Sequence, residues 1–461
     1  MRKFISFLML TAIFAMGCSE DNSGTSANNS ETFIFNEGTY LTPTIDSNGG
    51  VLTFGFKSST SWNIVESEEW IEVEPASGDA TDTEFEVVVL ENKSGDMRVA
   101  TIKVAYGKKS VDIILTQYAE LCAENEIAYR TTTGEILTLD SFEGFGSALI
   151  ENTYADGYGK MRFESEVKSI PAEAFKGCST LSLIILPKSL ESIGDSAFEE
   201  CTSLGSIAIG DNVTEIGSRA FYECRSLKSV DLAEGITTID AEAFSLCTQL
   251  ESIAIPEGVK SLNEKAFYNC ISLGNVSLAE GIESIGNHCF ALCSALTEVE
   301  LPDSITAVGN YAFTDCTALA KVAFGSGIES IGNNAFASCS ALSNIALPES
   351  LKSIGNYAFS NCSSIYNITI PANVESIGNY AFFNSTALYS IDCLATTVPA
   401  LGTYAFHKYH YDNSGESGEA GNIEELAYSP IGTIIYVPTD AVEAYKSADN
   451  WSDYATSIRA K

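Results

Sequence analysis

The chain has 461 residues and a formal net charge of -36 at pH 7, because 61 acidic residues stand against 25 basic ones. Nucleic acids and anionic membrane surfaces are bound mainly by Lys and Arg, so this balance argues against direct binding to either. The hydrophobic share of 45% is ample for a buried core, and the length exceeds what one compact core usually organises. We therefore expect several folded units and no nucleic-acid partner.

Residues 1–17 have the pattern of a targeting segment. A basic start is followed by an apolar run from Phe4 to Met16, which is too short to span a bilayer comfortably, and Gly17 then leads into Cys18. This segment resembles a bacterial lipoprotein signal, and residues 19–21 resemble the acidic patch that directs Bacteroidetes lipoproteins to the outer face of the outer membrane. The resemblance implies lipidation of Cys18, which would be the chain's only membrane attachment, and a location on the cell surface. A secreted protein with a chance Cys18 is the alternative.

Residues 18–31 are polar and acidic without apolar periodicity, so we expect a flexible tether. From residue 32 to 118 the pattern changes to short alternating segments, such as Phe85 to Val89 and Ala100 to Val104, with turn clusters between them. Alternation with regular turns predicts an all-β sandwich of about seven strands.

Within this segment, Trp70 to Gly78, Arg98 to Val104 and Leu115 to Gln117 resemble the BACON domain, an Ig-like sandwich. The family carries a proposed carbohydrate-binding role and a usual N-terminal position. The resemblance makes Trp62 and Trp70 candidate glycan contacts. The alternative is that both rings pack in the core, since a small sandwich needs large apolar side chains inside.

A 23-residue unit dominates the rest of the chain and reads L-x-x-I-x-L-P-x-x-L-x-x-I-G-x-x-A-F-x-x-C. A fixed period of this length predicts a solenoid, which we place at residues 168–409. The first Leu and Ile residues predict one strand, the second aliphatic pair returns the chain along the other wall, and Ala-Phe closes the core. We expect the Gly after the returning Ile, such as Gly286, to supply a left-handed backbone. The repeated Phe stands at Phe175, Phe198, Phe221, Phe244, Phe267, Phe290, Phe313, Phe336, Phe359, Phe382 and Phe406.

Nine cysteines occupy one position of the repeat, three residues after the Phe, and Ser385 fills it in the next coil. An odd ladder cannot pair completely, and no second ligand type shares its spacing, so we predict buried free thiols rather than disulfides or zinc sites. The nine are Cys178, Cys201, Cys224, Cys247, Cys270, Cys293, Cys316, Cys339 and Cys362.

The unit resembles the BspA-like leucine-rich repeat. The resemblance implies a right-handed solenoid with a parallel β-sheet on one wall, in surface proteins that mediate adhesion and other extracellular contacts. Because a solenoid needs covered ends, residues 119–167 are predicted to form an N-terminal cap and residues 410–461 a C-terminal cap. The fold class is thus mostly β: a sandwich followed by a capped solenoid.

No constellation for catalysis is recognisable in the sequence, which lacks the H-E-x-x-H, G-x-S-x-G, Walker and dinucleotide-binding patterns. We therefore predict a protein that is not an enzyme, with no cofactor and no metal. The loop histidines His407 and His410 could hold a metal, but we favour ordinary exposed residues.

Tyrosines gather in the C-terminal coils and make the predicted contact surface, because Tyr is frequent both in interface hot spots and in sugar stacking. The leading hypothesis is a monomeric cell-surface adhesin that binds a protein of the host or of a neighbouring cell. The alternative is binding of a carbohydrate such as a mucin glycan, and a purely structural role for the rings, shielding the coil edges, stays open. The candidate residues are Tyr311, Tyr357, Tyr366, Tyr380, Tyr389 and Tyr404.

Overall fold

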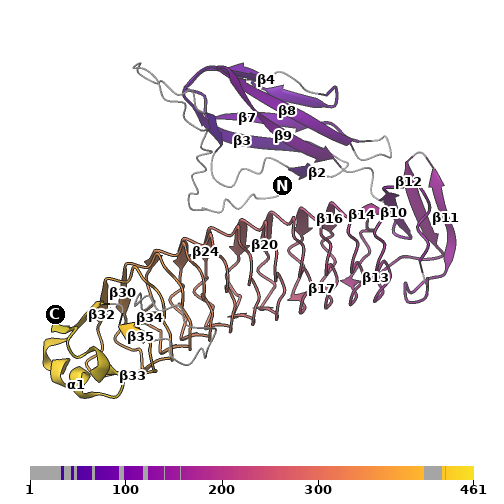
Figure 1. The fold of residues 1–461 in the computed structure, drawn as a ribbon. Helices are drawn as coiled ribbons and strands as arrows, with labels where there is room; N and C mark the ends of the chain where they lie inside the picture. The colour runs from indigo at the N-terminus through magenta and orange to yellow at the C-terminus, as the bar shows by residue number, and fades with distance from the viewer. Residues whose placement is uncertain are drawn as a thin grey trace, which may run out of the picture. The chain divides into compact units, whose positions relative to one another are not determined.

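The computed structural model describes residues 33–35, 43–45, 49–64, 68–92, 98–117, 123–139, 141–155, 157–409, 428–430 and 432–461 (Figure 1). The predicted signal segment, the lipidation site Cys18, the tether and His410 lie outside these residues. The chain divides into two compact units, Met1–Leu121 and Cys122–Lys461. Among the described residues only α1 (Val442–Ser447) is an α-helix, which confirms the mostly β class.

The first unit is a sandwich of two sheets, in the orders β1-β3-β7-β5 and β2-β9-β8-β4-β6. Its core holds the aromatic rings of Phe54, Phe56, Trp62 and Phe85, packed with Val and Ile from both sheets. The strands are β1 (Phe33–Phe35), β2 (Thr44–Ile45), β3 (Gly50–Ser58), β4 (Trp62–Ile64), β5 (Ile71–Glu74), β6 (Ser77–Gly78), β7 (Glu84–Val89), β8 (Arg98–Tyr106) and β9 (Lys109–Gln117).

The second unit begins with an antiparallel sheet of β10 (Glu126–Thr131), β11 (Leu149–Ala155) and β12 (Tyr158–Phe163). Its fourth strand is β14 (Leu181–Ile185), which belongs to the first coil and pairs with β10. The ring of Phe145 lies 6.2 Å from that of Phe175, the first ring of the repeat. This sheet therefore closes the N-terminal end of the solenoid core.

Both walls of the solenoid are made of short parallel strands. The wall predicted as the return segment forms one continuous 11-stranded sheet, which we call the long sheet. Its two-residue strands are β13 (Ser169–Ile170), β15 (Ser192–Ile193), β17 (Glu215–Ile216), β19 (Thr238–Ile239), β21 (Ser261–Leu262), β23 (Ser284–Ile285), β25 (Ala307–Val308), β27 (Ser330–Ile331), β29 (Ser353–Ile354), β31 (Ser376–Ile377) and β33 (Ala400–Leu401).

The opposite wall, which the Leu and Ile pattern predicted as the sheet, is divided into smaller parallel sheets. Its strands are β16 (Ser206–Ile209), β18 (Ser229–Leu232), β20 (Ser252–Ile255), β22 (Asn275–Leu278), β24 (Glu298–Glu300), β26 (Lys321–Ala323), β28 (Asn344–Ile345), β30 (Asn367–Ile370) and β32 (Ser390–Cys393). Parallel pairing joins each coil to the next along the long sheet, and on the opposite wall it joins the coils within each smaller sheet.

The repeated Phe rings form a continuous stack through the core. Neighbouring ring centroids from Phe175 to Phe406 are 5.1 to 5.5 Å apart, and the rings are close to parallel. Each ring is almost fully buried. One core therefore runs unbroken from the N-terminal sheet to the C-terminal end.

The repeated cysteines are free thiols, as predicted. All but Cys178 of the nine are buried, and in each buried case the Sγ donates to the carbonyl of the Phe in the preceding coil at 3.1 to 3.3 Å. Ser385 Oγ makes the same bond to the carbonyl of Phe359 at 2.8 Å. The position thus selects a small side chain that is also a hydrogen-bond donor.

The prediction that Gly286 and its equivalents supply a left-handed backbone is wrong. Positive φ values fall instead at other positions, including the residue two before each repeated Phe, where φ is 53 to 61° from Glu173 to Tyr404. Most coils instead have Gly where the backbone approaches the preceding coil closely, although Asp240 and Asn263 fill this position in two coils. A Cβ on Gly355 would lie 2.6 Å from the backbone N of Asn333 in the preceding coil.

The C-terminal end is closed by β34 (His407–Tyr409), β35 (Tyr428–Pro430), β36 (Ile434–Val437), the 3-10 helix Thr439–Ala441, α1, the 3-10 helix Trp451–Tyr454 and β37 (Ile458–Ala460). Trp451 is buried, and its Nε1 donates to the carbonyl of Pro399 at 2.8 Å. Tyr445 is buried beside it and donates to the carbonyl of Ala395 at 2.9 Å. No helix within the described ranges is both long and apolar enough to cross a bilayer.

Candidate binding surface

The candidate tyrosines of the C-terminal coils do not form one surface but lie on two walls. Tyr357, Tyr380 and Tyr404 each follow a strand of the long sheet by three residues, after β29, β31 and β33. Tyr366 and Tyr389 instead directly precede β30 and β32 on the opposite wall. The buried Ala-Phe segment of each coil lies between the two sets. The tyrosines within each set are therefore neighbours, but the two sets do not form one surface.

The rings of Tyr357 and Tyr380 are parallel, with centroids 4.7 Å apart and planes within 4°. Tyr404 extends the row at 5.5 Å with a tilt of 47°. Tyr311 is separated from this row by Asn334, which fills the intervening coil, and it stacks instead on His288 at 4.6 Å. Tyr311 is therefore not part of the predicted C-terminal surface.

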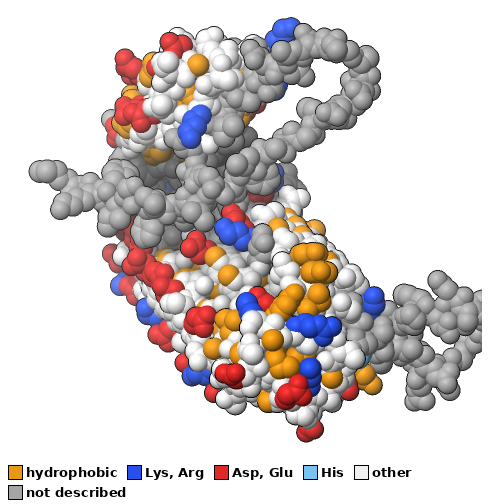
Figure 2. Space-filling model, turned by 90° about the vertical axis from the view of Figure 1, so that its left-hand side faces the viewer, with side chains coloured by type: hydrophobic (Ala, Val, Ile, Leu, Met, Phe, Trp, Pro, Cys, Tyr) orange, Lys and Arg blue, Asp and Glu red, His pale blue; other side chains and the backbone are white. Residues whose placement is uncertain are grey.

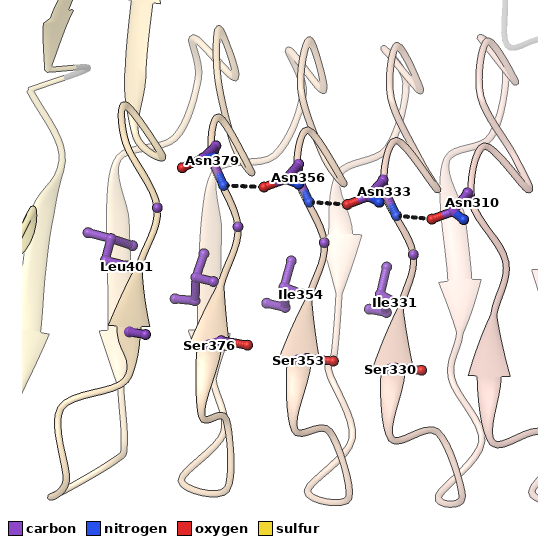
Figure 3. Close-up of a pocket in the computed structure, with 16 residues that line it drawn as sticks. Asn310, Ser330, Ile331, Asn333, Ser353, Ile354, Asn356, Ser376, Asn379 and Leu401 are labelled. Carbon is purple, nitrogen blue, oxygen red and sulfur yellow. Dashed lines mark hydrogen bonds between the residues drawn. The ribbon is translucent and has the colours of Figure 1, made fainter.

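A shallow groove of about 530 Å³ runs along the outer face of the long sheet beside the Tyr357 row. Figure 3 shows its two borders: a row of serines on the strands and a row of asparagines where the strands end, with glycines between them. Sixteen residues from Asn310 to Gly402 line it, and none of them is charged. We call this feature the Ser-Asn groove.

The asparagines of the groove are held in one conformation by the coils themselves. The Oδ1 of Asn310 accepts the backbone N–H of Asn333 at 2.8 Å, and the bond is repeated from Asn333 to Asn356 and from Asn356 to Asn379 (Figure 3). Because this bond fixes which end of each amide faces the next coil, the Nδ2 is the donor that each amide can offer to a ligand. This ladder was not predicted, although Gly-Asn at the 23-residue period was its visible signal.

The opposite wall presents a patch of aromatic and mixed character. The rings of Tyr366 and Tyr389 stack at 5.3 Å and are 54% and 52% exposed. The strand register continues this surface from β32 to β36 and β37, which adds the half-buried Ile434 and Tyr436 and the exposed Arg459. We call these five residues the Tyr366 patch. Figure 2, which views the C-terminal side, shows hydrophobic side chains gathered on that side with acidic ones chiefly along one border.

The tryptophans of the sandwich do not form a platform for sugars. Trp62 is 2% exposed and packs against Phe56 and Phe85, so of the two alternatives it is a core residue and not a glycan contact. Trp70 is half-buried, and the guanidinium of Arg98 lies over its ring at 4.3 Å. A cation over the ring face competes with a stacked sugar for the same position.

His407 is a buried residue, contrary to the expectation of an ordinary exposed histidine. It is 5% exposed, and its Nδ1 lies 2.7 Å from the hydroxyl of Tyr454. Burial lowers the pKa of His407, and burial together with the charge of Lys265 lowers the pKa of His288. The described residues contain no group of three His, Cys, Asp or Glu side chains arranged to hold a metal ion.

Comparison with known proteins agrees with this architecture. A family model described as "BspA type Leucine rich repeat region" matches residues 168–297 and 283–411 in six copies. A second family model, BACON, described as an N-terminal binding domain, matches residues 60–118. No curated protein matches the chain.

Several bacterial leucine-rich repeat structures are similar to this chain. A leucine-rich repeat protein of Bacteroides ovatus is 27% identical over 64% of this chain and 76% of its own, with a TM-score of 0.46. The leucine-rich repeat protein of T. pallidum is 30% identical over 34% of this chain and 75% of its own, with a TM-score of 0.32. The pneumococcal vaccine antigen PcpA is 19% identical over 80% of this chain and 98% of its own, with a TM-score of 0.40. Since the repeat family's match extends from residue 168 to 411, more than half of the 461 residues, this chain belongs to the family of BspA-type leucine-rich repeat proteins.

Proposed function

We propose that this protein is a cell-surface adhesin that binds an extracellular protein and performs no catalysis. The membership in the repeat family and the match to a binding domain support a role in surface interaction. The observation that carries the protein partner is the Tyr366 patch, where two stacked tyrosines are each more than half exposed. Stacked rings of this kind are held in place before binding, so little side-chain entropy is lost when a partner covers them.

The chemistry of the patch suits a protein partner. Tyr and Arg are enriched at the centres of protein interfaces, and this patch joins Tyr366, Tyr389 and Tyr436 to Arg459. Asp392 lies in register with Tyr436 and forms an ion pair with Lys461 at 2.7 Å. Lys461 and Arg459 therefore place positive charge near the tyrosine rings, although the chain as a whole carries -36. A flat surface with aromatic anchors and a mixed-charge border is typical of a protein interface.

The tyrosines of the Tyr366 patch can be replaced by a residue type that already occurs at the same position of the repeat. Ser343 occupies the position of Tyr366 in the preceding coil, so Tyr366→Ser with Tyr389→Ser introduces a residue that the solenoid already accepts. We expect this double variant to bind a panel of purified matrix and secreted glycoproteins at least about tenfold more weakly, with unchanged thermal unfolding.

Ile271→Ser is the matched control, because Ile271 is a 45% exposed apolar residue of an earlier coil. It should leave binding unchanged. The panel is tested before and after enzymatic deglycosylation, and binding that disappears with the glycans would contradict a protein partner. Equal binding by the double variant and the parent chain would remove the Tyr366 patch from the proposal.

We also propose that Cys18 carries the lipid anchor and that the anchored chain faces outward from the outer membrane. The arrangement of residues 1–21 supports this, and Cys18→Ala tests it. Metabolic labelling with a fatty acid should mark the parent chain and not the variant, and protease added to intact cells should digest the labelled protein. A labelled chain that resists the protease until the cells are lysed would place the anchor on the inner side.

A further inference from the structure

The Ser-Asn groove is a second surface, on a different wall from the Tyr366 patch. We propose that it binds a neutral linear polysaccharide, laid along the axis of the solenoid. The inference does not depend on a protein partner, because no residue of the Tyr366 patch lines the groove.

The groove offers hydrogen bonds of a kind that suits sugar hydroxyls. Its asparagine amides keep their Nδ2 donors for a ligand, since their Oδ1 atoms accept bonds from the next coil. The hydroxyls of Ser330, Ser353 and Ser376, each half-buried, stand in a row on the other border and can both donate and accept. Groups held in place by the backbone bind a polar ligand without a further loss of side-chain entropy.

The charge of the groove favours a ligand without charge. None of its lining residues is acidic or basic, although the chain as a whole carries -36. Just outside the serine row, Lys352 is bonded to Glu329 at 2.8 Å, and this hydrogen bond raises the pKa of Lys352. Since this nearest lysine is engaged by a carboxylate, a polyanion would find no cation in the groove and would meet the field of the acidic chain.

Aromatic rings border the groove on its asparagine side. Tyr357 and Tyr380 directly follow Asn356 and Asn379 in the chain, and their rings form the parallel pair that Tyr404 extends. Polar groups that fix orientation beside apolar rings are the usual composition of a small-molecule site. Because Tyr357 and Tyr380 cover each other's faces, their ring edges are the apolar surface that a sugar would contact.

The repeat of the groove suits a polymer better than a single sugar. Paired strands lie about 4.8 Å apart, so the three central coils of the groove each present one Ser, one Gly and one Asn at that interval. This interval is comparable with the length of one pyranose unit in an extended chain. A linear polysaccharide along the axis would therefore meet an equivalent set of hydrogen-bonding groups at each successive sugar.

The full-length chain can be tested by affinity electrophoresis in gels that contain a soluble β-glucan, xyloglucan, galactomannan or, as the anionic counterpart, polygalacturonate. We expect retardation by at least one neutral polymer and none by polygalacturonate. Ser353→Glu places a carboxylate in the groove and should weaken binding roughly tenfold or more. Glu215 occupies the equivalent strand position in an earlier coil, so the fold accepts this side chain.

Two further variants separate the groove from its surroundings. Tyr357→Asn with Tyr380→Asn and Tyr404→Asn uses the residue that Asn334 already places at this left-handed position, and it should also weaken binding roughly tenfold. Ser261→Glu, on a strand outside the groove, should bind as the parent chain does. Thermal unfolding of all three variants is compared with that of the parent chain.

Three results would overturn the proposal. The first is that no neutral polymer retards the parent chain, and the second is that Ser353→Glu binds as tightly as Ser261→Glu. The third is that Ser353→Glu abolishes binding to a deglycosylated protein, which would make the groove a site for polypeptide. Loss of binding in Tyr366→Ser with Tyr389→Ser, by contrast, concerns the adhesin proposal alone.

Discussion

At the residue two before each repeated Phe, the fold fixes the backbone conformation but accepts many side chains. Glu, Ser, Arg, Lys, His, Tyr and Asn all occupy this position, each with φ between 53 and 61°. A left-handed backbone costs a residue other than Gly on the order of 1 kcal/mol or more, and Asn tolerates it best. The sequence did not reveal this position, because all the residues found there except His288 and Asn334 are of types that seldom adopt a left-handed backbone.

The glycines after the returning Ile residues allow a test of whether close approach of neighbouring coils selects glycine there. Gly355→Ala would place a Cβ 2.6 Å from the backbone of the preceding coil, where nothing flexible can move aside. We expect a loss of about 1–3 kcal/mol in the free energy of unfolding. Chemical denaturation followed by circular dichroism measures it.

Gly210→Ala is the matched control for that substitution. Nothing lies within 4 Å of a Cβ built on Gly210, its φ is not positive, and Ala233 fills the same turn in the next coil. The control should be neutral or stabilising by up to about 1 kcal/mol. Equal destabilisation by both substitutions would show that close approach of the coils is not the reason for Gly355.

The buried thiols should be chemically silent in the folded protein. Burial raises the pKa of the repeated cysteines well above its usual range, and that of Cys293 to about 12, so the reactive thiolate is scarce at any ordinary pH. We expect the eight buried ladder thiols to resist iodoacetamide at pH 8.5 in the native chain and to react fully in denaturant without a reductant. Mass spectrometry of the labelled peptides measures this, and persistent protection in denaturant would instead indicate disulfides.

At the scale of elements, the repeat predicted the existence of the coils well but assigned the continuous sheet to the wrong wall. The Leu and Ile alternation marks burial, which it predicted correctly, whereas continuity of a sheet depends on backbone pairing between coils. A strand of two residues, such as Ser353–Ile354, is too short to show the alternation of apolar and polar residues by which strands are recognised in a sequence. The sequence places the two sets of tyrosines at different positions of the repeat, but it did not show that these positions lie on separate walls.

The C-terminal cap should loosen in mild acid. The hydroxyl of Tyr454 accepts the backbone N–H of Phe406 at 3.1 Å and lies 2.7 Å from Nδ1 of His407. With the ring neutral and its proton on Nε2, the Tyr454 O–H donates to Nδ1, and we expect this tautomer. Burial lowers the pKa of His407 in the folded state, with a small opposing effect of Asp453. The unfolded chain then binds more protons than the folded chain at pH values between the lowered pKa and the ordinary value of about 6.5.

Stability from this contact is thus present above about pH 6.5 and is lost as the pH falls through the lowered pKa. Hydrogen exchange at β33 and β34, compared between pH 7.5 and 5.5, should show faster opening at the lower pH. Tyr454→Phe should reduce stability by about 1 kcal/mol at pH 7.5 and remove most of this pH dependence. Exchange that is equal at the two pH values in the parent chain would contradict the role of His407.

At the scale of the whole molecule, the two units have separate cores, since no residue belongs to both of the buried clusters. We expect fragments 1–121 and 122–461 to fold alone, each with an unfolding midpoint within a few degrees of the matching transition in the full chain. Differential scanning calorimetry measures the transitions. A shift of either midpoint by about 10 °C would indicate that the units stabilise each other.

The uniform spacing of the coils has a consequence for reach. From β13 to β31 every pair of strands in the long sheet joins residues 23 positions apart, so along this wall each coil pairs with its neighbours in the same register. Inserting or deleting a whole coil would preserve all these contacts and change the length of the array by about 4.8 Å. The tyrosine coils lie beside the C-terminal cap, so the number of plain coils before them sets how far they stand from the N-terminal sheet. A change in the number of coils would therefore alter the distance between the tyrosine coils and the N-terminal sheet and leave the binding residues unchanged.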